Sequence, residues 1–87
     1  MHASPEGRSR RWIVRSPDDL GRAIAGVRAE RGLTQAQLAK EADVDRSYLA
    51  RLEAGASTLV LERSLRALRR MGATVTVTLD DPADPSQ

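Results

Sequence analysis

The chain has 87 residues, no cysteine, one histidine, and 14 lysine or arginine residues against 12 acidic ones, a formal net charge of +2. This length allows one small domain, and the absence of cysteine, with a single histidine, excludes a disulfide framework and leaves no metal site. No apolar run approaches the roughly 20 residues that span a bilayer, so we expect no membrane partner and a cytoplasmic protein.

The charges are unevenly distributed. Asp80, Asp81 and Asp84 lie near the C-terminus without a basic partner, which leaves fourteen basic against nine acidic residues, a net charge of +5, in residues 1–79. Every basic residue except Lys40 is arginine, whose planar guanidinium fits phosphates and guanine edges. A codon bias toward arginine produces the same excess. The arginines therefore indicate DNA binding only at positions where the helix spacing also indicates it.

The N-terminal third predicts an arm, an extended segment and a helix. Residues 1–11 lack periodicity and are predicted to form a disordered arm, whereas residues 12–15 are apolar and β-branched. Ser16 is an expected N-cap, Pro17 fits the first helical position, and Gly32 is a typical helix end. The apolar residues that recur between them at helical spacing are Leu20, Ala23, Ile24 and Val27.

The next segment predicts two short helices joined by a tight turn. Thr34 and Asp45 are the expected caps, Gly55 ends the second helix, and the small Ala39 lets the helices approach closely. The apolar residues that would hold the helices together are Leu38, Ala42, Val44, Leu49 and Leu52. This spacing is typical of a helix-turn-helix, whose second helix enters the major groove of DNA.

A fourth helix and a strand complete the predicted domain, residues 12–79. The helix places leucines on one face and arginines, expected to be solvated, on the other, and it closes at Gly72. The two sets are Leu61, Leu65 and Leu68, and Arg63, Arg66, Arg69 and Arg70. The period then changes from about 3.6 to 2, which predicts a strand over residues 73–79. Residues 80–87 are predicted to form a disordered acidic tail.

A single strand would leave its backbone groups unpaired. It can pair with residues 12–15 of the same chain or with the identical strand of a second subunit, and both pairings can occur together. We favour the second subunit because symmetric dimers are the commonest oligomers. The dimer interface is then expected to contain Trp12, Val75, Val77 and Leu79.

The residues of the helical region resemble a known family. Residues 34–55 carry Thr-Gln, Leu-Ala, a turn, an Arg-Ser helix start and a Leu-Glu-x-Gly exit, the pattern of the Cro and phage-repressor (XRE) helix-turn-helix family. The Ser-Pro helix opening, the Met-Gly-Ala end of the fourth helix and the terminal strand are similar to antitoxins of the HipB type.

The sequence departs from the family pattern at two places. Asp43 stands at the turn where the family usually has glycine, and aspartate tolerates the left-handed backbone better than most residues. Leu59 and Val60 stand where the family often has Pro-Ser, so Ser57 or Thr58 is expected to cap the fourth helix.

The resemblance implies a mainly α, four-helix domain with a C-terminal strand that pairs across a dimer. It implies a homodimer that binds a palindromic operator in double-stranded DNA and represses its own operon. An alternative is a HipB-like antitoxin whose partner is a HipA-like kinase toxin, and a third is a basic module without sequence preference. No Ser/His pairing or phosphate-cradling glycine loop is present, so we expect neither an enzyme nor a cofactor.

The resemblance also assigns the DNA-binding positions. Arg46 and Arg51 would face the major groove, where arginine binds guanine O6 and N7, unless they are solvated or paired with Glu41 or Glu53. In the family, the glutamine at position 35 holds a phosphate and braces the recognition helix. The expected DNA-binding residues are Thr34, Gln35, Gln37, Arg46, Ser47, Tyr48 and Arg51.

Overall fold

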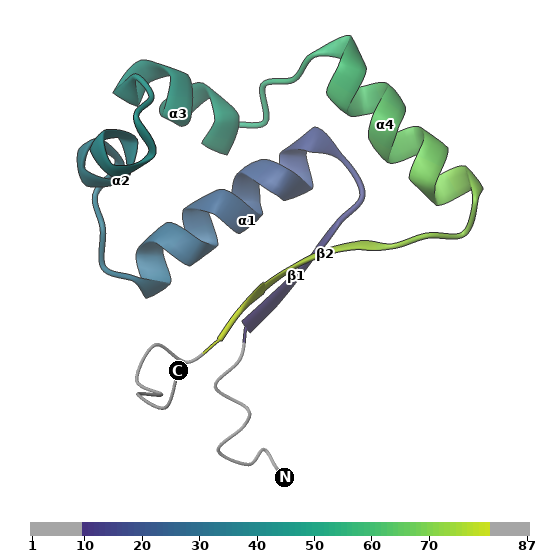
Figure 1. Cartoon of the computed structure of the whole chain (residues 1–87), viewed down its shortest axis with the longest axis horizontal. Coiled ribbons are helices and arrows are strands. Elements are labelled where there is room, and N and C mark those ends of the chain that lie inside the picture. Colours follow the sequence, from purple (N-terminus) through teal and green to yellow (C-terminus); the bar gives the residue numbers. More distant parts are fainter. Residues whose placement is uncertain (1–9, 81–87) are drawn as a thin grey trace, which may run out of the picture.

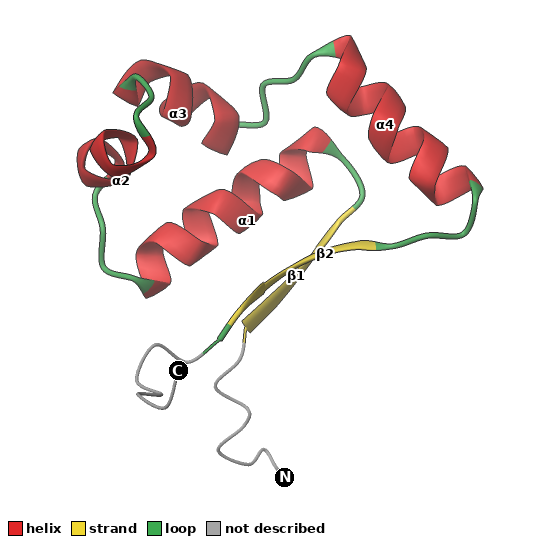
Figure 2. Cartoon of the chain, viewed as in Figure 1, coloured by secondary structure: helices red, strands yellow, loops and turns green. Residues whose placement is uncertain are grey.

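The computed structural model describes residues 10–80, in which two strands and four helices follow one another (Figure 1). The expected mainly helical fold with a C-terminal strand is confirmed (Figure 2). In chain order the elements are β1 (Arg10–Val14), α1 (Pro17–Glu30), α2 (Gln35–Ala42), α3 (Arg46–Glu53), α4 (Leu59–Arg70) and β2 (Val75–Leu79).

The helices begin where local chemistry predicts. The Ser16 hydroxyl accepts a hydrogen bond from the N–H of Asp19 at 3.2 Å, and proline takes the first position of α1. Thr58, and not Ser57, caps α4, since its hydroxyl accepts from the N–H of Leu61 at 3.2 Å. Each cap satisfies an N–H group that has no acceptor within its own helix.

The turn between α2 and α3 depends on a left-handed residue. Asp43 adopts φ 60° and ψ 45°, and in residues 10–80 it is the only residue other than glycine with a positive φ. Its N–H and that of Val44 donate to the carbonyls of Lys40 and Ala39, which closes the turn. The predicted conformation is therefore confirmed, with the backbone cost that a side chain carries there.

Asp43→Gly is expected to raise the free energy of unfolding by about 0.5–1 kcal/mol, because glycine adopts this backbone without steric cost. Asp43→Ala should lower it by a similar amount. Urea denaturation of both variants measures the two effects, and equal stability of glycine and alanine would show that the turn does not impose this conformation.

The two strands pair with each other in antiparallel register, with Trp12 opposite Val77 and Val14 opposite Val75. The same-chain pairing is thus present, while a pairing with a second subunit stays a prediction. The strand bounds differ from the expected ones: β1 begins at Arg10, inside the expected arm 1–11, and β2 spans five residues of the expected 73–79. The ladder between the strands orders Arg10 and Arg11, which sequence periodicity alone does not reveal. Residues 1–9 and 81–87 lie outside the described residues.

The hydrophobic core lies between the sheet, α1 and α4. Val14, Ala23 and Leu65 form its buried centre. The partly buried side chains packed against it are Trp12, Leu20, Leu61, Val75 and Val77. A Cβ at Gly26 would lie 2.5 Å from the indole of Trp12, so this glycine of α1 provides the space for the ring.

Three of the four side chains expected at a dimer interface therefore have a place within their own chain. Trp12, Val75 and Val77 pack against the buried core of their own chain. Leu79 is half-buried at the end of the sheet. Whether they also touch a second subunit stays a prediction.

Candidate nucleic-acid interface

The helix pair α2–α3 lies on the opposite side of α1 from the sheet (Figure 1). α2 packs closely against α3, and α3 packs against α1. Ala39 and Leu49 are buried at 3% and 4% exposure, as the small residue and the apolar spacing predict. Ala42 and Val44, also expected to hold the two helices together, are exposed, Val44 at 37%, because they flank the turn at the edge of the pair. The pair thus forms one end of the molecule, with the outer side of α3 open to solvent.

The outer side of α3 carries polar side chains. Arg46, Ser47, Tyr48 and Arg51 are all exposed, while Leu49 faces inward. No described residue forms a hydrogen bond or ion pair with the Arg46 guanidinium, and the guanidinium of Arg51 lies 6.0 Å from the centroid of the Tyr48 ring. Pairing with Glu41 or Glu53 is therefore not seen for either arginine. Both are available to a ligand of α3.

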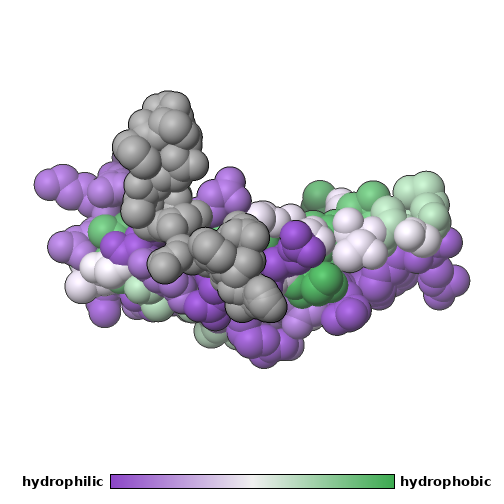
Figure 3. Space-filling view, turned by 90° about the horizontal axis from the view of Figure 1, so that it is seen from below, coloured by the Kyte–Doolittle hydropathy of each residue, from purple (hydrophilic) through white to green (hydrophobic). Residues whose placement is uncertain are grey.

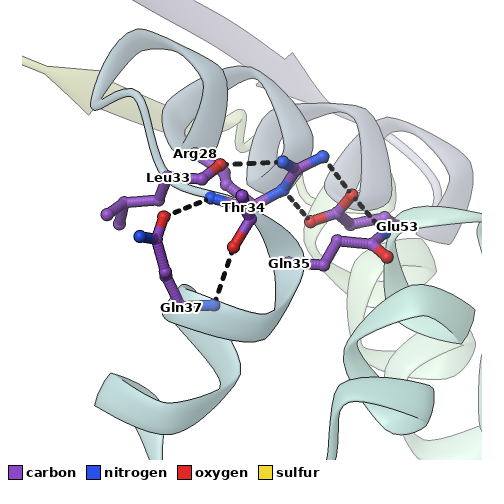
Figure 4. A network of polar contacts seen from close by, with 6 residues as sticks. All are labelled: Arg28, Leu33, Thr34, Gln35, Gln37 and Glu53. Carbon is purple, nitrogen blue, oxygen red and sulfur yellow. Dashed lines mark hydrogen bonds and ion pairs between the residues drawn. The ribbon is translucent and has the colours of Figure 1, made fainter.

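A polar network holds α3 to α1 and α2 (Figure 4). Arg28 of α1 donates from Nε and from the guanidinium to the two carboxylate oxygens of Glu53, at 2.7 and 3.0 Å, and to the Leu33 carbonyl at 2.9 Å. Gln35, the first residue of α2, donates its amide to Glu53 at 3.0 Å. Glu53 ends α3, so one carboxylate joins three helices and fixes the direction of the helix that carries Arg46.

The network shifts the pKa values of two of its members. The hydrogen bonds from Arg28 lower the pKa of Glu53, and the bond from Gln35 acts in the same direction. Burial opposes them, since the Glu53 side chain is only 8% exposed. The pKa of Arg28 is raised by the same pair. Glu53 is therefore charged at neutral pH.

Thr34 and Gln37 form a reciprocal cap at the start of α2 (Figure 4). The Thr34 hydroxyl accepts from the N–H of Gln37 at 3.0 Å, and the Gln37 side-chain oxygen accepts from the N–H of Thr34 at 2.8 Å. Both side chains are exposed but occupied by the cap. The helix start they stabilise has the N–H groups and positive dipole end that favour a phosphate.

Asp45 differs from the sequence prediction. It occupies the N-cap position of α3 with an extended backbone, but its side chain makes no cap hydrogen bond. The carboxylate is exposed, so solvent competes for it and the turn itself, with Leu49 N–H bonded to the Asp45 carbonyl at 3.0 Å, starts the helix.

Sequence reasoning missed two features beside α3. One is the Arg28 partner of Glu53, for which a charged residue at a half-buried position of α1 was the only signal. The other is a hollow of about 390 Å³ between α3 and the start of α4. Its lining residues are Tyr48, Arg51, Leu52, Ala56, Ser57, Thr58 and Leu61. A loop provides much of this lining, and loops lack the periodic hydrophobic pattern from which helices and strands are predicted.

Two further findings concern the described residues alone. None of their helices is both long and apolar enough to cross a bilayer. Within residues 10–80 no group of three or more histidine, cysteine or acidic residues is arranged to hold a metal ion.

Comparison with known proteins agrees with this geometry. The chain is 31% identical over 64 residues to the "Uncharacterized HTH-type transcriptional regulator y4mF" of Sinorhizobium fredii, which covers 74% of this chain and 84% of that relative. No solved structure matches the chain. The family model described as "Helix-turn-helix domain" matches residues 19–81, which include most of α1, the whole of α2, α3 and α4, and β2. The chain therefore belongs to the family of helix-turn-helix DNA-binding proteins.

Proposed function

We propose that this chain is a sequence-specific transcriptional regulator that binds a palindromic operator in double-stranded DNA as a homodimer and represses its own operon. The observation that carries the proposal is Arg46, exposed and without a described partner on the first turn of a helix fixed by the Glu53 network. The relative in Sinorhizobium fredii, named a transcriptional regulator, supports the same class of function.

In this proposal α3 enters the major groove with its N-terminal turn foremost. Arg46 binds guanine O6 and N7 through its two parallel N–H donors, and Ser47 contacts the neighbouring base or phosphate. Arg51 and Tyr48, whose side chains are adjacent, contact the next bases or the backbone. The first turn of α2, with Gln35, binds a phosphate and sets the register of α3 on the duplex.

The homodimer follows from the way such helices read DNA. One eight-residue helix contacts only a few base pairs, and two copies related by a two-fold axis read half-sites about 34 Å apart. A palindromic site doubles the contacts and so supplies the discrimination that autorepression needs.

Arg46→Ala is expected to weaken binding to a selected site by about 1–3 kcal/mol, because a bidentate arginine–guanine contact is lost. Arg63→Ala is the matched control, because Arg63 is an exposed arginine on α4 and its substitution does not change α3. Binding is measured by fluorescence anisotropy at fixed salt, and circular dichroism checks the fold. Equal losses for the two variants would mean that Arg46 adds charge but reads no base.

The antitoxin alternative stays a prediction, because the described residues carry no feature that points to a kinase. It predicts that a kinase-like protein co-purifies with the chain in stable stoichiometry. The non-specific alternative predicts equal affinity for a selected site and a scrambled duplex at matched salt.

A further inference from the structure

The helix α4 is apolar over a wider sector than its own core requires. Successive residues of an α-helix are rotated by about 100°, so Leu61, Leu65 and Leu68 share one sector of about 60°. Leu65 is 6% exposed and the other two are half-buried, which identifies this sector as the one that faces the core.

A second sector, of two large apolar side chains with two small ones between them, lies beside the first and faces solvent. It is formed by the α4 stripe, which we define as Val60, Ser64, Ala67 and Met71, again within about 60° of rotation. All four side chains are exposed, Val60 at 76% and Met71 at 73%. Scattered apolar side chains on a surface need no explanation, but a stripe at helical spacing does.

No element of residues 10–80 covers the α4 stripe. α1 packs closely against α3 and β1, and α2 against α3, whereas α4 joins the domain mainly through Leu61 and Leu65. Figure 3 shows hydrophobic side chains gathered at the end of the molecule where Figure 1 places α4. The stripe is therefore open to a partner along the length of the helix.

The order of residues in the α4 stripe is a palindrome of size: large, small, small, large. When two copies of α4 pack antiparallel about an axis between Leu65 and Arg66, Val60 lies opposite Met71 and Ser64 lies opposite Ala67 of the other copy. The two small central residues let the helices approach, and each large end fills the space beside the other copy's large end. An isologous two-fold interface requires this self-complementarity, whereas an unrelated partner does not.

We propose that the α4 stripe is the surface on which a second copy of this chain docks, with the two α4 helices antiparallel. The proposal deepens and rests on the homodimer of the proposed function, and it assigns that homodimer's apolar contact to α4. Trp12, Val75 and Val77 are already packed on their own core, and Ile13 of β1 is 40% exposed, so Val60 and Met71 at 76% and 73% offer more open apolar surface than the sheet does.

Cysteine cross-linking tests the predicted pairing, because the chain has no cysteine of its own. In the antiparallel pair, position 60 meets position 71 of the other copy, while two copies of position 60 are offset by about 16 Å. An equimolar mixture of Val60→Cys and Met71→Cys should therefore form a disulfide-linked dimer under mild oxidation, and each variant alone should form several-fold less.

Leu59→Cys mixed with Met71→Cys is the matched control. Leu59 is 61% exposed and adjacent in sequence to Val60, but it lies about 100° away on the charged side of α4. This mixture should cross-link several-fold less than the first. Equal cross-linking in both mixtures, or as much in Val60→Cys alone, would overturn the proposal.

Sedimentation equilibrium provides a second readout. Val60→Glu should raise the dimer dissociation constant at least tenfold, and Leu59→Glu should leave it within about twofold. Both variants place a carboxylate in the first turn of α4, where the helix dipole favours it. The two variants should therefore form α4 equally well. A monomeric native chain, or a dimer insensitive to Val60→Glu, would overturn the proposal.

Selection of DNA from a random pool by the native chain separates this proposal from the function on which it rests. Selected sites together with a monomeric chain, or with no cross-link between positions 60 and 71, would remove the α4 interface and leave the regulator. The specific cross-link without any selected site would remove the regulator and leave the α4 interface.

Discussion

Gly21→Ala is expected to lower the free energy of unfolding by about 3 kcal/mol. A Cβ at this position of α1 would lie 2.4 Å from the carbonyl oxygen of Leu52 and 2.7 Å from that of Glu53. Both atoms are backbone of α3, so the clash is relieved only when the recognition helix moves away from α1. The variant should therefore lose DNA affinity as well as stability.

Urea denaturation measures this effect, with Arg22→Ala as the control. Arg22 follows Gly21 in α1, its side chain is 70% exposed, and among residues 10–80 it pairs only with Asp19, so its removal should change stability by less than about 0.5 kcal/mol. Helix propensity alone predicts the opposite outcome for Gly21→Ala, a gain of about 1 kcal/mol. Such a gain would show that α1 and α3 do not approach as closely as the structure describes.

Glu53→Gln is expected to cost about 2–3 kcal/mol at neutral pH, because it removes a nearly buried charge from a bidentate bond with Arg28. The loss should depend on pH. The pKa of Glu53 is lowered from an ordinary value of 4.5 in the folded protein, so its contribution is complete above about pH 4.5 and disappears as the pH falls through the lowered value.

The difference in stability between native chain and Glu53→Gln, measured by urea denaturation from pH 7 to pH 2, isolates this group. Asp19 also has a lowered pKa, through its bonds to the Arg15 N–H and to Arg22, but both proteins share it and it cancels. The difference should shrink toward zero at the acid end. A difference independent of pH would mean that the shape of Glu53, and not its charge, holds α3.

Local chemistry explains which parts of the fold were predictable. Ser16 and Thr34 cap their helices and Asp43 turns left-handed because each depends on residues within a few positions. Residues 12–15 were one of two candidate partners for β2, but the sequence could not decide between them, because the contact between the Trp12 ring and Gly26 joins residues far apart in the chain. The sequence indicated both an extended N-terminal segment and a terminal strand. Their pairing within one chain depends on this long-range packing.

The candidate site divides in the same way. Leu49 and Leu52 are spaced so that they lie on the inner face of α3, which leaves Arg46 and Arg51 exposed. This spacing can be seen in the sequence. The Arg28–Glu53 pair does not, since the two residues lie on different helices and either could have met another charge. Asp45 has the residue type of a cap and the position of one, but an exposed carboxylate gains little from one more hydrogen bond.

The central claim is that the exposed side of α3 reads DNA sequence, and selection from a random duplex pool at physiological salt tests it most directly. The account predicts enrichment of one motif with two-fold symmetry and guanine in each half-site, and loss of that guanine when Arg46→Ala replaces the native chain. Recovery of a pool as random as the input, with binding that depends on salt alone, would contradict it.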